Sequence, residues 1–233
     1  MTDLAAGNSS PSSLVPLTNV QACVFDAYGT LFDLDATVGR ARDRMGDKTA
    51  VLTRAWRAKQ KELAARPRAA GDSDYWHITG NALDSALSEL SIADPHLRAR
   101  LMQLVLNIDA FADAAPALQC LKEGGMRTAV LSNGTTTMLL SATKHTALYK
   151  VLDQVISTET IHTFKPAPAA YALASERLHL DPGVICYISG NAWDAEAAAN
   201  AGYRAVWIER GGEPARLALK LGSLRELPAL LGL

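Results

Sequence analysis

The sequence predicts an α/β protein in which a parallel sheet carries helices on both faces and is interrupted once by an all-helical insertion. From residue 114 onward, short apolar runs alternate with stretches of helical periodicity, which is the pattern of a parallel sheet. Between residues 35 and 109 only helical periodicity occurs. The chain has 233 residues, 48% of them hydrophobic, so it can bury a substantial core.

The sheet is expected to begin with residues 22–25, an apolar run that stops at Asp26 and is followed by the turn Tyr28-Gly29-Thr30. This pattern predicts a buried strand that delivers a carboxylate at its C-terminal end. The helical insertion follows. Its apolar residues recur at helical spacing over residues 50–65, 78–90 and 96–108.

The second half of the chain alternates. Helices are predicted over residues 114–122, 136–146, 169–178 and 194–201. Strands are predicted over residues 128–131, 155–156, 184–188 and 205–208. We therefore expect a Rossmann-like core domain of residues 19–34 and 112–233 and a helical cap domain of residues 35–111. The Ser- and Pro-rich residues 1–18 are predicted to form a flexible arm.

Composition excludes several classes of protein. The net charge is −1 and the pI about 6.5, so no basic surface for nucleic acid is expected. No apolar stretch is long enough to span a membrane, and the N-terminus lacks the pattern of a signal peptide. Cys23, Cys120 and Cys186 lie far apart, as is typical of free thiols in a reducing cytoplasm. We expect a cytoplasmic protein.

Polar residues follow the predicted strands. Asp26 and Thr30 come after the first strand and Ser132 and Asn133 after the second, while Ser189, Asn191 and Asp194 come after a later strand. Carboxyl ends of parallel strands meet at one edge of a sheet, where ligands bind. Lys165 lies just before a helix and is expected at the same edge. Each residue alone has an ordinary explanation as a cap, turn or surface residue, but their recurrence at strand ends indicates a site.

Four sequence blocks resemble the haloacid dehalogenase superfamily, and within it the L-2-haloacid dehalogenase branch. They are FDAYGTLFD at residues 25–33, LSNG at 131–134, FKP at 164–166 and SGNAWDA at 189–195. The match runs from about residue 20 to about residue 210, in the order found in the family. A fifth segment, WRAKQ at residues 56–60, resembles part of the family's cap.

The resemblance implies that Asp26 is a nucleophile. Phosphatases of the superfamily carry a second Asp at the position of Tyr28 and an acidic Mg²⁺ ligand at the position of Asn191. Only Asp194 is left of that acidic set, whereas Mg²⁺ prefers several oxygen ligands. We therefore expect neither a metal nor another cofactor, and chemistry at carbon rather than phosphorus.

The branch further implies hydrolysis at the α-carbon of a small 2-substituted carboxylic acid through an aspartyl ester. Lys165 would keep Asp26 ionised, Asp194 would orient Lys165 or the hydrolytic water, and Arg57 would contact the leaving halide. The implied catalytic residues are Asp26, Lys165, Asp194, Arg57, Thr30, Ser189 and Asn191. The implied substrate-binding residues are Tyr28, Ser132, Asn133, Tyr171 and Trp193.

The chain also departs from the branch. Lys61, Leu63 and Ala65 replace Leu, Tyr and Trp of the family's cap wall, and Gly190 replaces a Ser. Loss of the Trp ring changes the shape of the pocket. Three interpretations therefore stay open: an (S)-2-haloacid dehalogenase, an enzyme similar to azetidine-2-carboxylate hydrolases that opens a C–N ring, and a catalytically silent binding module. Relatives in this branch often form dimers, so a homodimer is expected.

Overall fold

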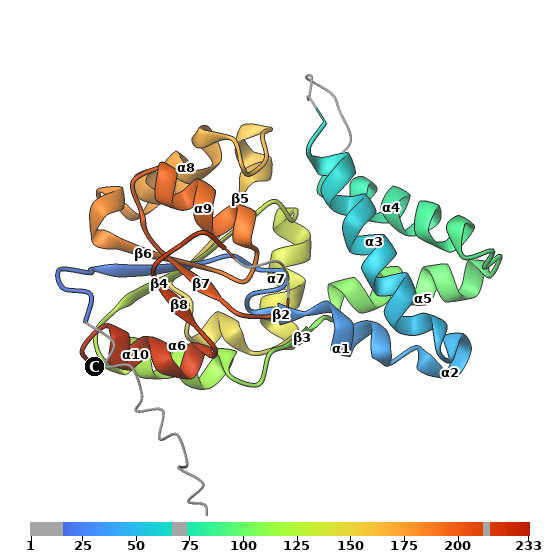
Figure 1. Cartoon of the computed structure of the whole chain (residues 1–233), viewed down its shortest axis with the longest axis horizontal. Coiled ribbons are helices and arrows are strands. Elements are labelled where there is room, and N and C mark those ends of the chain that lie inside the picture. Colours follow the sequence, from blue (N-terminus) through green and yellow to red (C-terminus); the bar gives the residue numbers. More distant parts are fainter. Residues whose placement is uncertain (1–15, 67–73, 212–214) are drawn as a thin grey trace, which may run out of the picture.

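The computed structural model describes residues 16–66, 74–211 and 215–233 (Figure 1). The predicted arm therefore lies almost entirely outside the described residues. A six-stranded parallel sheet has the order β5-β4-β1-β6-β7-β8. Its strands are β5 (Gln154–Ser157), β4 (Arg127–Ser132), β1 (Ala22–Phe25), β6 (Ile185–Ser189), β7 (Arg204–Ile208) and β8 (Lys220–Leu221). The predicted fold class is confirmed, and β1 lies within the sheet between β4 and β6.

Successive residues of β1 point to opposite faces of the sheet, and helices bury both faces (Figure 1). Ala22 and Val24 share an apolar cluster with α8 (Pro168–Leu178) and α9 (Ala192–Asn200). Cys23 and Phe25 belong to the cluster on the other face. The helices of that face are α6 (Ala114–Glu123), α7 (Thr136–His145) and α10 (Leu227–Leu230). Burial on both faces explains why β1 reads as a continuous apolar run.

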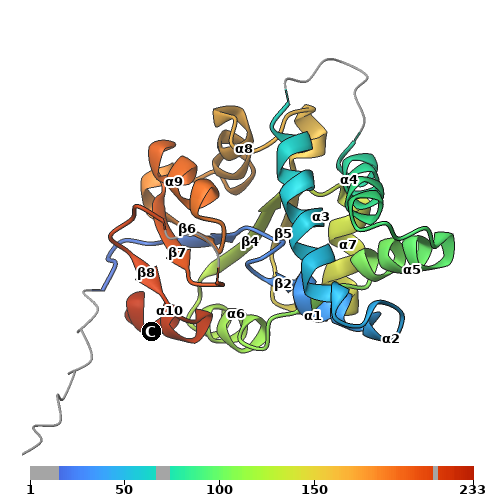
Figure 2. The same cartoon turned by 45° about the vertical axis from the view of Figure 1, so that its right-hand side comes forward.

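The helical insertion lies beside the sheet, beyond the end at which β1 finishes (Figures 1 and 2). It packs around its own apolar cluster, which includes Trp56, Leu83 and Leu101. The Trp56 indole donates a hydrogen bond of 2.9 Å to the Thr79 carbonyl and so ties two of the helices together. The insertion contains α1 (Leu34–Gly39), α2 (Arg42–Met45), α3 (Lys48–Ala64), α4 (Tyr75–Glu89) and α5 (Pro95–Leu106).

A second, two-stranded antiparallel sheet joins the chain that enters the insertion to the chain that leaves it. It pairs β2 (Phe32–Asp33) with β3 (Asp109–Ala110). The sequence predicts neither strand, because two residues are too few to show an alternating pattern. β2 lies before the stretch of residues 35–109 in which only helices are expected, and β3 begins at the last residue of that stretch. The remaining short helices are η1 (Leu148–Lys150), η2 (Thr158–Ile161), η3 (Pro182–Val184) and η4 (Leu224–Glu226).

Side chains at the helix starts explain several element boundaries. Asp33, Asp74 and Asp94 each accept a backbone N–H three residues on, and so cap α1, α4 and α5. Pro95 occupies the first position of α5, where its missing N–H costs nothing. No helix in the described ranges is long and apolar enough to cross a membrane.

Candidate active site

Asp26 follows β1 directly and is held by three side-chain donors. Its Oδ1 accepts a hydrogen bond of 2.7 Å from the Lys165 ammonium, and its Oδ2 accepts from Thr30 Oγ1 at 2.9 Å and Asn191 Nδ2 at 2.7 Å. The side chain is 8% exposed. The tight turn after Asp26 brings Thr30 back, because the N–H groups of residues 30–32 all donate to the Ala27 carbonyl.

Lys165 lies between two carboxylates. Its ammonium is 2.7 Å from Asp26 and 3.0 Å from Asp194, and the Lys165 side chain is 2% exposed. Burial by itself would lower the pKa of Lys165, but the charges of Asp194 and Asp26 outweigh burial and raise this pKa. Lys165 therefore stays an ammonium, and a buried positive charge faces the Asp26 carboxylate.

Asp194 anchors this ammonium and is anchored by two tyrosines. Tyr171 donates to its Oδ1 at 2.7 Å and Tyr187 to its Oδ2 at 3.0 Å. Burial raises the pKa of Asp194, and the Lys165 charge opposes that rise. Tyr187 also lies 3.0 Å from the Lys165 ammonium. The sequence gives little signal for Tyr187, because it sits inside the apolar run of β6; only its place two residues before Ser189 puts it at this edge.

The loop after β4 positions Lys165 through its backbone. Asn133 Oδ1 accepts the Lys165 N–H at 2.8 Å, and Asn133 Nδ2 donates to the Lys165 carbonyl at 3.2 Å. Ser132 Oγ accepts the Gly134 N–H at 3.1 Å. In the same way, the buried Ser189 Oγ accepts the Asn191 N–H at 3.1 Å. The two serines thus shape the loops that present the site, and their hydroxyls bond to backbone in this structure.

The helical insertion contributes Arg57 from α3. Its Nη1 lies 3.4 Å from Asp35, and the Arg57 side chain is 40% exposed. Its Nη2 reaches the loop that follows Asp26, since a Cβ placed on Gly29 would lie 2.8 Å from it. Arg57 is therefore beside the loop that carries Asp26, and its contact with Asp35 is a loose surface ion pair.

Two tyrosines lie where the insertion meets the sheet. Tyr28 packs against apolar residues of both parts, and its hydroxyl is buried with no hydrogen-bond partner in the described part of the chain. Tyr75, at the start of α4, meets the Phe164 ring edge-on at 5.4 Å. Burial and then the charge of Asp26 raise the pKa of Tyr75. Tyr75 is not among the predicted site residues, although the pair Tyr75-Trp76 is a signal for it. Trp193 is half-buried in the first turn of α9.

The residues present do not fit the Mg²⁺ of the superfamily's phosphatases. The Lys165 ammonium already bridges Asp26 and Asp194, and the Asn191 amide turns a donor toward Asp26. No group of three His, Cys, Asp or Glu side chains within residues 16–66, 74–211 and 215–233 could hold a metal ion. The donor set suits an anionic nucleophile paired with a cation.

Gly190 has no room for a side chain. A Cβ there would lie 2.0 Å from the Gly29 carbonyl oxygen and 2.9 Å from Arg210 Cγ. The Ser that the family carries at this position therefore cannot be accommodated without moving the loop that follows Asp26. Replacing Ser with Gly therefore removes a hydroxyl, and it also allows the backbone of residues 28–30 to lie against residue 190.

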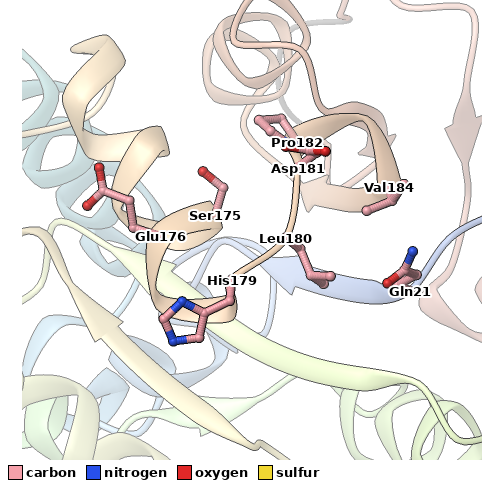
Figure 3. A pocket seen from close by; sticks show the side chains of 8 residues that line it. All are labelled: Gln21, Ser175, Glu176, His179, Leu180, Asp181, Pro182 and Val184. Atoms are coloured by element: carbon pink, nitrogen blue, oxygen red, sulfur yellow. The ribbon is translucent and has the colours of Figure 1, made fainter.

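A separate hollow of about 440 Å³ lies at the opposite edge of the sheet, where β1 and β6 begin (Figure 3). Gln21, Leu180 and Val184 are among its lining residues, which include none of the predicted site residues in the described chain. The polar constellation around Asp26 is at the other end of the same strands.

Comparison with known proteins agrees with this geometry. Residues 20–202 match the family model described as haloacid dehalogenase-like hydrolase. The chain is 38% identical over 220 residues to (S)-2-haloacid dehalogenase 4A of Burkholderia cepacia, covering 91% of this chain and 95% of that protein. It is 37% identical to (S)-2-haloacid dehalogenase 1 of Pseudomonas sp. (strain CBS-3), with 91% and 96% covered.

Solved structures give the same answer. A crystal structure described as a dehalogenase superposes with a TM-score of 0.88 at 37% identity, covering 92% of this chain and 98% of that one. The L-2-haloacid dehalogenase of Xanthobacter autotrophicus with chloropropionic acid covalently bound superposes with a TM-score of 0.82 at 28% identity, covering 91% and 98%. These relatives do not support the azetidine-2-carboxylate alternative. The chain is a hydrolase that belongs to the haloacid dehalogenase-like family and, within it, to the L-2-haloacid dehalogenase branch.

Proposed function

We propose that this protein is an (S)-2-haloacid dehalogenase that works without a metal. The observation that carries the proposal is the environment of Asp26, whose carboxylate faces one ammonium and two neutral donors. Phosphoryl transfer in the superfamily needs a second carboxylate and Mg²⁺, and Tyr28 and Asn191 stand at those positions. The similarity to dehalogenases over nine-tenths of the chain supports the same reaction.

The proposed reaction has two steps at Asp26. The carboxylate attacks C2 of the substrate from the side opposite the halogen, so a C–O bond forms as the carbon–halogen bond breaks and halide leaves. Water then attacks the carbonyl carbon of the Asp26 ester, which releases the 2-hydroxy acid and a proton and restores the carboxylate. Two displacements of moderate difficulty replace one difficult displacement. The covalently bound chloropropionic acid in the Xanthobacter autotrophicus structure supports an intermediate of this kind.

The neighbours of Asp26 have roles that follow from their contacts. Lys165 keeps Asp26 ionised before the first step. During ester hydrolysis it stabilises the negative charge that forms on the carbonyl oxygen of the Asp26 ester when water attacks. Asp194 and its two tyrosine donors hold Lys165 in place. Thr30 and Asn191 orient Oδ2, which leaves Oδ1 as the oxygen with a single donor.

In this proposal, both the sheet-bearing part of the chain and the helical insertion contribute substrate contacts. Ser132, Asn133 and nearby backbone N–H groups would bind the substrate carboxylate, with Tyr28 and Trp193 around the carbon chain. Tyr171, which the resemblance assigns to substrate binding, is buried in the apolar cluster of α8 and α9 and donates to Asp194, so its proposed role is to support Lys165. Arg57 would swing from its loose pair with Asp35 to stabilise the departing halide. With Arg57 in this role, the helical segment 35–111 is a cap domain that lies over the core domain of residues 19–34 and 112–233. A cytoplasmic location and a homodimer are part of the same proposal, by resemblance to the branch.

A substrate panel tests the proposal. Purified enzyme with EDTA is mixed with each enantiomer of 2-chloropropionate and with chloroacetate. A separate sample without EDTA receives p-nitrophenyl phosphate and Mg²⁺, as the control for phosphatase chemistry. We expect halide release from chloroacetate and from the (S)-enantiomer in the presence of EDTA. Absence of halide release together with Mg²⁺-dependent release of phosphate would overturn the proposal, and inactivity toward every compound would favour the silent binding module.

A further inference from the structure

Arg210, two residues beyond the end of β7, is a largely buried cation that the proposed reaction does not use. Its side chain is 12% exposed. Its guanidinium forms a two-point contact with Asp113, with distances of 3.0 Å from Nη1 and 2.7 Å from Nη2. The guanidinium carbon also lies 3.9 Å from the centre of the Phe111 ring. So many contacts on one side chain indicate that its position is closely specified.

A further Arg210 contact leads to the nucleophile. Nη2 donates to the Thr30 carbonyl at 3.2 Å. The hydroxyl of the same Thr30 donates to Asp26 Oδ2 at 2.9 Å and accepts the Gly190 N–H at 2.8 Å. Because Arg210 holds the backbone of Thr30, it sets where the hydroxyl that orients Asp26 lies. The missing side chain of Gly190 leaves the space that the Arg210 stem occupies.

The other Arg210 partners belong to the chain returning from the helical insertion. Phe111 follows β3 directly, and its N–H donates to the Leu31 carbonyl at 2.9 Å. Asp113 also accepts the Ser223 hydroxyl at 2.8 Å and the Leu224 N–H at 2.9 Å. Burial opposes ionisation of Asp113, but the hydrogen bonds from Arg210 and these groups lower its pKa. The Arg210–Asp113 pair is therefore ionised, and its contacts join four segments far apart in sequence, at residues 30, 111–113, 210 and 223–224.

We infer that Arg210 is a positioning residue that fixes the nucleophile loop at Thr30 to the return connection of the cap, Phe111–Asp113. Arg210 acts through Thr30, because its hydrogen bonds in the described part of the chain go to Thr30 and Asp113 and not to Asp26. A lysine keeps the charge but has one compact ammonium, which cannot reproduce the two-point contact with Asp113 while reaching Thr30 and stacking on Phe111. The expected effect on kcat rests on the proposed dehalogenase reaction, whereas the expected effect on the order of the loop does not.

The test compares Arg210→Lys with Arg204→Lys. Arg204 is the first residue of β7, the strand that precedes Arg210, and it bonds to the Gly183 and Thr18 carbonyls at the far end of the sheet. In steady-state assays with (S)-2-chloropropionate, we expect Arg210→Lys to lower kcat about tenfold to a hundredfold, the scale of a small misplacement of a reacting group, with KM changed little. Arg204→Lys should retain wild-type kcat. Equal kcat in both variants would overturn the inference.

A double-mutant cycle shows whether Arg210 acts through Thr30. Thr30→Val removes the hydroxyl that orients Asp26, so adding Arg210→Lys to it should cost little further kcat. If the reduction in kcat of the double variant equals the product of the two single reductions, Arg210 does not act through Thr30 and only stabilises the fold. Thermal denaturation of every variant confirms that the folded protein is being assayed.

Hydrogen exchange provides a readout that needs no turnover. Peptides covering residues 27–32 should exchange their backbone N–H groups faster in Arg210→Lys than in the wild type, while Arg204→Lys should leave these peptides unchanged. Unchanged exchange in Arg210→Lys would overturn the inference even in an active enzyme. A wild type that releases no halide would instead refute the proposed function, and the exchange comparison would still decide the role of Arg210.

Discussion

Replacing Lys165 with Met should leave two carboxylates buried around an empty position. The ammonium lies 2.7 Å from Asp26 and 3.0 Å from Asp194. At an effective dielectric constant of about 20, each contact represents Coulomb attraction of about 6 kcal/mol. Proton uptake by one of the carboxyls limits the loss, because neutralising a buried acid is easier than burying its unpaired charge. Breaking a buried pair in this way costs about 3–5 kcal/mol.

Urea denaturation followed by circular dichroism measures this loss. We expect Lys165→Met to lower the free energy of unfolding by about 3–5 kcal/mol, while Lys144→Met at the exposed end of α7 changes it by less than about 0.5 kcal/mol. Removing the second charge should compensate, so Lys165→Met combined with Asp194→Asn should be more stable than Lys165→Met alone. A single variant as stable as the wild type, or a double variant less stable than the single, would refute this reasoning.

The same charges predict how stability depends on pH. The pKa of Lys165 in the folded protein is raised above its ordinary value of 10.5. The stabilisation from its charge is therefore complete below pH 10.5 and is lost as the pH rises through the higher folded pKa. Urea titrations at alkaline pH should show this loss in the wild type and a smaller loss in Lys165→Met. Parallel pH profiles for the two proteins would contradict the assignment of the raised pKa to Lys165.

Three further substitutions test separate contacts. Gly190→Ala should abolish most activity by displacing the Gly29 carbonyl, which lies 2.0 Å from the new Cβ, whereas Gly183→Ala in open space should be neutral; normal halide release by the first variant would contradict this. Tyr28→Phe removes a hydroxyl that is buried with no hydrogen-bond partner among the described residues, so urea denaturation should show unchanged or slightly higher stability, and a loss above about 1 kcal/mol would contradict this. Arg57→Ala should raise the barrier to halide release by about 3 kcal/mol, the scale of losing one transition-state donor, and an unchanged kcat would return Arg57 to a surface role.

The sequence predicts the fold well because the two halves of the chain have different periodicities. β1, β4 and β6 are buried on both faces, so they read as apolar runs, and the stretch between residues 35 and 109 shows helical spacing. The pairing of β2 with β3 and the edge strand β8 do not show in the sequence. Each has only two residues, and tertiary contacts rather than local pattern determine them.

Strand ends predict much of the candidate site, and the resemblance to the family adds Arg57 and Tyr171, whereas Tyr187 and Arg210 are not predicted. Asp26 and Asp194 come after apolar runs and meet at Lys165, and Asn191, which follows the same run as Asp194, donates to Asp26. Tyr187 is hidden within such a run. Arg210 is bonded to residues 97 and 180 positions away in sequence, and no local pattern indicates that pairing. The contacts of a buried arginine depend on how the segments cross in three dimensions.

The central claim is that Asp26 becomes an ester during turnover, and isotope labelling tests it most directly. Enzyme in excess over (S)-2-chloropropionate is allowed a single turnover in H₂¹⁸O, and the peptide containing Asp26 is then analysed by mass spectrometry. Because water attacks the carbonyl carbon of the ester, the account predicts ¹⁸O in the Asp26 carboxylate and unlabelled oxygen in the hydroxy acid. Label found in the hydroxy acid, with Asp26 unlabelled, would show that water attacks the substrate directly and would contradict the account.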